Sequence, residues 1–167
     1  QNGLQLITLN LLNGRSEDFR KTWDEREDQL TVKSIKTTDG VDLEFSHKYD
    51  TLMIKLPKTL MAGQKINLEI VSEGDFLKNY DGDSYLVLGN MAYFPQADIE
   101  STKAPFHAIL KTQKPYTPLG CGVNLRRWEE GDLNCVETRE EMNMAFPFLV
   151  IGDFEIAEKQ KEGYDLK

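Results

Sequence analysis

The chain has 167 residues, of which 40% are hydrophobic and 29% are charged, as is usual for a globular protein. A chain of this length is about one domain long and can bury roughly 70% of the surface that its unfolded form exposes. Its net charge of −8, from 28 acidic and 20 basic residues, argues against a nucleic-acid backbone or an anionic membrane as its partner.

The segment over residues 16–27 departs from the pattern of the rest of the chain. Ser16 can serve as a helix N-cap, and acidic residues follow it in what would be the first turn. Phe19 and Trp23 would then lie on one face of a helix. A short helix and an irregular strand both fit this segment.

Strict alternation of apolar and polar residues marks the next part of the chain. Residues 41–45, 52–56 and 66–70 each alternate with period two, which predicts half-buried strands. The pair Asp39-Gly40 is a strong hairpin signal between 30–36 and 41–47. The apolar phase slips near Lys33 and Ser34 and again near Leu6 and Ile7, and each slip predicts a bulge.

The later strands follow the same logic. Phe106, Ala108 and Leu110 share one face of a strand, and "EEGD" at 129–132 predicts a hairpin turn. "FPFLVI" at 146–151 is apolar on both faces, as a central strand would be, and is too short to span a membrane. The pattern as a whole predicts one antiparallel β-sandwich domain of about nine strands over residues 1–167. The predicted core is Val41, Leu43, Phe45, Leu52, Ile54, Leu56, Ile66, Leu68, Ile70, Phe106, Leu110, Phe148 and Val150.

The two cysteines are predicted to be buried thiols. If the hairpin turn centres on Glu130 and Gly131, Cys135 lies opposite Arg126, and Cys121 lies too far away for a disulfide. Their spacing also does not match a zinc site.

No catalytic or metal-binding constellation emerges from the residues. His47 and His107 lie in strand patterns and lack the i, i+4 helical spacing of a zinc hydrolase. The spacing of Asp81 and Asp83 matches the first two ligands of a calcium-binding loop. Tyr85 stands where the next oxygen ligand is needed, so a solvated turn at Gly82 is favoured. Acidic pairs are too numerous to single out a glycosidase, and no nucleophile motif is present.

The order of the motifs resembles the N-terminal β-domain of zinc aminopeptidases of the aminopeptidase N type. The segment 30–74 is similar to that domain's strands joined by "DG" and "AG" turns, with "LP" closing one strand. "YFP" at 93–95 resembles the family's aromatic–Pro element, and 142–155 resembles the last strand of the domain. The Thr-Gln that many members carry before the aromatic–Pro element is absent.

The resemblance implies a non-catalytic domain that caps an active-site cleft and docks on a catalytic domain of the same polypeptide, which this chain lacks. Zinc would belong to that catalytic domain, and this chain itself would hold no cofactor. Tyr93, Phe94 and Pro95 are then candidates for interdomain contact, and Asp83 and Gln96 for contact with the substrate cleft. An extracytoplasmic β-sandwich module that binds carbohydrate or protein is the alternative.

Two further expectations concern the chain ends and the compartment. Because the chain begins with Gln1 and ends in a polar, charged segment, we expect it to be a piece of a longer polypeptide that stops at a domain boundary. A periplasmic or secreted location is favoured.

Overall fold

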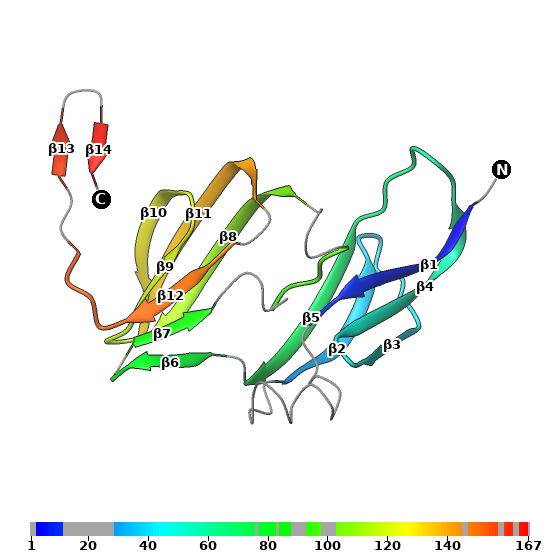
Figure 1. The fold of residues 1–167 in the computed structure, drawn as a ribbon, viewed down its shortest axis with the longest axis horizontal. Coiled ribbons are helices and arrows are strands. Elements are labelled where there is room, and N and C mark those ends of the chain that lie inside the picture. The colour runs from blue at the N-terminus through cyan, green and yellow to red at the C-terminus, as the bar shows by residue number, and fades with distance from the viewer. Residues whose placement is uncertain are drawn as a thin grey trace, which may run out of the picture. The chain divides into compact units, whose positions relative to one another are not determined.

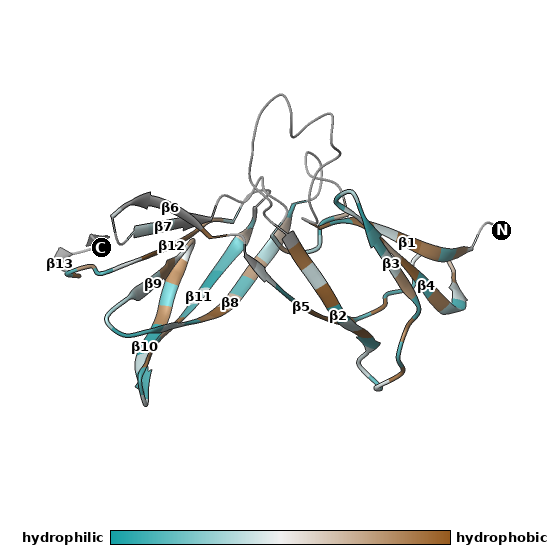
Figure 2. Cartoon of the chain, turned by 90° about the horizontal axis from the view of Figure 1, so that it is seen from below, coloured by the Kyte–Doolittle hydropathy of each residue, from teal (hydrophilic) through white to brown (hydrophobic). Residues whose placement is uncertain are grey.

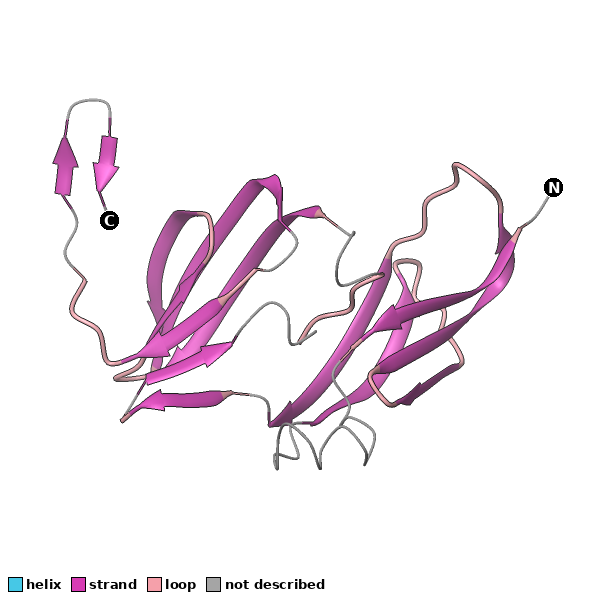
Figure 3. Cartoon of the chain, in the orientation of Figure 1, coloured by secondary structure: helices cyan, strands magenta, loops and turns pink. Residues whose placement is uncertain are grey.

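The computed structural model contains strands, turns and loops, and no helix among the residues that it describes (Figure 3). The described residues are 3–11, 29–75, 77–82, 84–87, 93–97, 103–144, 147–156, 159–161 and 164–166. Every strand pairing among them is antiparallel, which confirms the predicted all-β antiparallel fold. The segment 16–27, for which a short helix and an irregular strand were both open, lies outside the described residues.

The described part of the chain has fourteen strands, more than the nine or so predicted, because several are only three or four residues long (Figure 1). The first seven are β1 (Leu4–Asn10), β2 (Gln29–Thr37), β3 (Phe45–Lys48), β4 (Thr51–Leu60), β5 (Leu68–Asp75), β6 (Lys78–Asp81) and β7 (Ser84–Val87). The others are β8 (Ala104–Gln113), β9 (Thr117–Gly120), β10 (Val123–Glu130), β11 (Leu133–Met144), β12 (Leu149–Gly152), β13 (Lys159–Lys161) and β14 (Tyr164–Leu166).

The chain divides into two compact units. The first unit comprises residues 1–77 and 89–103, and the second comprises residues 78–88 and 104–167. The chain therefore passes from one unit to the other more than once. The assignment of all 167 residues to a single domain stays a prediction.

The first unit contains a three-stranded sheet of order β1-β4-β3 and a two-stranded sheet of β2 and β5. Apolar and polar residues alternate in bands along β2 (Figure 2). The apolar faces bury a single cluster of aliphatic side chains, against which Ile7, Leu9, Leu68 and Ile70 also pack. The cluster consists of Leu11, Leu30, Val32, Ile35, Leu43, Leu52 and Ile54.

The local irregularities of the first unit follow the sequence signals. Gly40 has a φ of 85° in the turn after β2, where the Thr37 N–H donates to the Val41 carbonyl. Only glycine adopts such a φ at no steric cost, which explains the "DG" signal. The register of β2 against β5 shifts between Val32 and Ser34, as predicted, and that of β1 shifts between Leu4 and Leu6.

The second unit contains a sheet of order β10-β11-β8 and a sheet of order β6-β7-β12-β9. β12 lies between β7 and β9, which confirms that 149–152 form a central strand. The hairpin of β10 and β11 also forms as predicted, with Glu130 opposite Leu133. A separate small hairpin joins β13 to β14.

Of the thirteen predicted core residues, four are buried, six are half-buried and three are exposed; the half-buried ones are Ile66, Leu68, Ile70, Phe106, Leu110 and Val150. Leu43, Leu52, Ile54 and Leu56 are buried as predicted, whereas Val41, Phe45 and Phe148 are 45%, 38% and 44% exposed. Val41 lies just after the turn at Gly40 and Phe148 just before β12, and both are outside a regular strand; Leu43 also precedes β3 but is buried. Phe45 shares the face of its buried partner Ile54, but it lies on the edge strand β3, where less covers it.

Both cysteines are buried and free, as predicted. The detailed register differs from the expected one, because the turn consists of Gly131 and Asp132 rather than of Glu130 and Gly131. Cys135 therefore lies opposite Trp128, and Arg126 lies opposite Glu137. The turn at Gly82, between β6 and β7, is also present.

Candidate functional site

The segment 93–97 lies against the end of β1 within the first unit. The Asn10 N–H donates to the Gln96 carbonyl at 2.6 Å, and the Gln96 N–H donates to the Asn10 carbonyl at 2.9 Å. The rings of Tyr93 and Phe94 meet edge to face, with centroids 5.0 Å apart. This segment therefore closes one edge of the β1-β4-β3 sheet, as a structural frame would.

The residues that the resemblance singled out have different environments. The side chains of Tyr93, Phe94 and Pro95 are half-buried, so each keeps some surface for contact with another domain. Gln96 is only 4% exposed. Asp83 lies outside the described residues. The roles expected for these five residues remain predictions.

The two histidines lie in different units and have ordinary protein partners. His47 Nε2 is 2.8 Å from the Leu11 carbonyl in the first unit, and His107 Nε2 is 2.8 Å from Glu137 Oε1 in the second. No group of three or more potential ligands (His, Cys, Asp or Glu) is close enough to hold a metal ion among the described residues. No described helix is long and apolar enough to cross a bilayer.

The outer face of the β10-β11-β8 sheet carries a network of ion pairs, which we call the charged face. Glu137 accepts from His107 and from Arg126 Nε, the latter at 2.6 Å, and Lys111 Nζ is 2.6 Å from Glu130. The hydrogen bond from His107, and then that from Arg126, lower the pKa of Glu137. The hydrogen bond to Lys111 likewise lowers the pKa of Glu130 and raises that of Lys111. These shifts describe paired surface charges rather than a catalytic acid or base.

Trp128 lies on the edge strand β10 of the charged face and is half-buried. The guanidinium carbon of Arg126 lies 4.4 Å from the centroid of the indole ring, a cation–π contact. The indole also hydrogen-bonds to Glu130. Sugar-binding modules present an open aromatic ring, and Trp128 does not offer one on this side.

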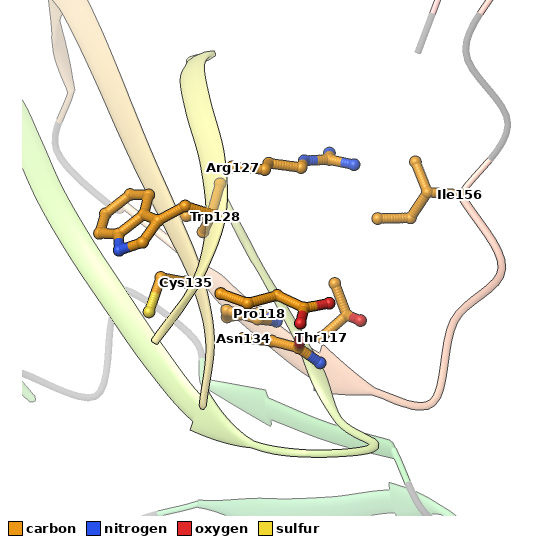
Figure 4. Close-up of a pocket in the computed structure, with 9 residues that line it drawn as sticks. Thr117, Pro118, Arg127, Trp128, Asn134, Cys135 and Ile156 are labelled. Carbon is orange, nitrogen blue, oxygen red and sulfur yellow. The ribbon is translucent and has the colours of Figure 1, made fainter. Parts of the chain in front are cut away.

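A pocket of about 330 Å³ lies on the opposite face of the same sheet (Figure 4). Pro118 and Val136, both buried, are among the residues that line it. Arg127 and Ile156 lie on two sides of it (Figure 4). Sequence analysis missed this pocket. Alternation along β10 could have indicated that Arg126 and Arg127 lie on opposite faces of the strand, but no sequence signal places Ile156 near Arg127.

Comparison with known proteins bears on the fold. No family model and no curated protein matches the chain. Among solved structures, an M1 zinc metallopeptidase from Deinococcus radiodurans aligns over 99% of this chain with a TM-score of 0.73 and 16% sequence identity. The chain has the fold of the N-terminal portion of M1 zinc metallopeptidases. A two-domain M1 zinc metallopeptidase variant bound to L-arginine also aligns, over 90% of the chain, with a TM-score of 0.71 and 16% identity.

The similarity covers only part of each of these peptidases. The chain spans 35% to 39% of the length of the M1 metallopeptidases that it matches. At 16% identity the likeness establishes the fold, which agrees with the resemblance in the motif order of residues 30–157. The part of the fold that matches is a non-catalytic region of those peptidases.

Proposed function

We propose that this chain is the N-terminal domain of an M1-type, zinc-dependent aminopeptidase-like protein. In this proposal it is not catalytic itself, but caps the active-site cleft and docks on a catalytic domain that comes after it in the polypeptide. The observation that carries the proposal is the fold match over 99% of the chain, together with the motif order in the sequence.

The docking contact is proposed to include Tyr93, Phe94 and Pro95. Their rings are held rigidly, because Gln96 anchors the segment to β1 through two backbone hydrogen bonds. Aromatic side chains that are fixed in place lose little conformational entropy on binding, which favours them as interface anchors. Asp83 and Gln96 are kept as candidates for contact with the substrate cleft, Gln96 only after a local shift, because its side chain is buried and its backbone N–H and carbonyl both pair with Asn10.

The alternative, a carbohydrate- or protein-binding module, has less support. A carbohydrate module needs an exposed aromatic platform, whereas Trp128 is capped by Arg126. The segment 93–97 is built into the edge of a sheet instead of projecting as a binding loop. The domain hypothesis therefore explains more of the structure.

The gene provides the first test. If the proposal is correct, the open reading frame continues past Lys167 and encodes a helical HExxH motif within about one to two domain lengths, or roughly 100–300 residues. Two histidines one helical turn apart and a later acidic ligand would complete three zinc ligands and leave the fourth position for water. A stop codon directly after Lys167, or a continuation without this motif, would contradict the proposal.

The docking role is tested in the full-length protein. Replacing Tyr93 and Phe94 together by serine should increase protease cleavage between the domains and lower the release of amino acids from aminoacyl substrates. Tyr49→Ser is the matched control, because Tyr49 lies in the same unit and is 71% exposed. Equal behaviour of the double variant and the control would rule out an interface at residues 93–95, while leaving the domain assignment to the gene test.

A further inference from the structure

We draw no further inference here: the strongest candidate, the cavity of about 270 Å³ between residues 42–44 and 55–57 of the first unit, carries nothing, because the charged side chains that line it already form ion pairs, Glu44 with Lys55 and Asp42 with Lys36.

Discussion

The two units of this chain bury different kinds of side chain. In the first unit, the buried cluster consists entirely of leucine, isoleucine and valine. In the second unit, the buried residues are smaller or more polar and include Pro118, Cys121, Cys135, Val136 and Thr138. The Thr138 hydroxyl donates to the Cys121 carbonyl, so a polar group is satisfied inside this unit.

This difference predicts different weaknesses. A core of large aliphatic side chains is destabilised most when a side chain is shortened, because a cavity remains. A core in which strands approach closely is destabilised most when an atom is added. A close-packed interior can accommodate extra volume only with strain. Glycines mark such positions in both units: a Cβ on Gly3 of the first unit would run into Thr59, and in the second unit one on Gly120 would run into Thr138 and one on Gly152 into Phe154.

The largest expected effect is in the aliphatic core. Ile54→Ala should lower the free energy of unfolding by about 2–5 kcal/mol, because Ile54 is fully buried in the cluster. Chemical denaturation of wild type and variant measures the difference. Met53→Ala is the matched control: Met53 is the preceding residue of β4 and is 39% exposed, so it should cost much less. Similar costs for the two variants would mean that β4 does not bury the face assigned to it.

The complementary test adds one methyl group to the second unit. Gly122→Ala should cost about 2–4 kcal/mol, because Gly122 has a φ of 83° and a Cβ there would run into the backbone of Arg139. Gly131→Ala is the control, since Gly131 also has a positive φ, of 60°, but nothing lies within 4 Å of its Cβ position. We expect Gly131→Ala to cost only about 1 kcal/mol for the backbone conformation. If both variants lose the same stability, the clash of a Cβ at Gly122 with the backbone of Arg139 does not determine the cost of the substitution.

Sequence periodicity anticipated the centre of each strand better than its ends. Leu52, Ile54 and Leu56 alternate in an uninterrupted strand, and their burial follows directly from that pattern. The failures at Val41 and Phe148 lie just outside regular strands, although Leu43, which also precedes β3, is buried as predicted. Leu11 and Val136 are among the most buried residues and were not in the predicted core. Leu11 comes after the end of β1, and Val136 lies among polar neighbours.

The candidate sites were less predictable than the fold, for a physical reason. The aromatic–Pro segment was visible as a motif, but its attachment to β1 depends on the pairing of Gln96 with Asn10, which is distant in the sequence. The pocket depends on which strand lies opposite Arg127 and on the course of the chain at Ile156. Local sequence carries the period of a strand, and it does not carry the long-range pairing that brings such residues together.

The smallest predicted effect concerns the charged face of the second unit. Hydrogen bonds from His107 and Arg126 lower the pKa of Glu137 in the folded protein. A carboxyl whose folded pKa is depressed adds stability above its unfolded pKa, about 4.3, and loses it as the pH falls through the lower folded value. Glu137→Gln should therefore reduce stability slightly at neutral pH and flatten its decline below about pH 5.

Denaturation midpoints measured from about pH 7 down to about pH 3 would check this prediction. Glu141→Gln is a suitable control, because Glu141 lies on the same strand, is 78% exposed and has Arg139 at 3.4 Å as its ion-pair partner. The Glu137 side chain is only 16% exposed and accepts hydrogen bonds from two partners. Glu137→Gln should therefore change the slope of stability against pH more than Glu141→Gln does. Parallel pH profiles for wild type and Glu137→Gln would show that ionisation of Glu137 does not stabilise the folded protein.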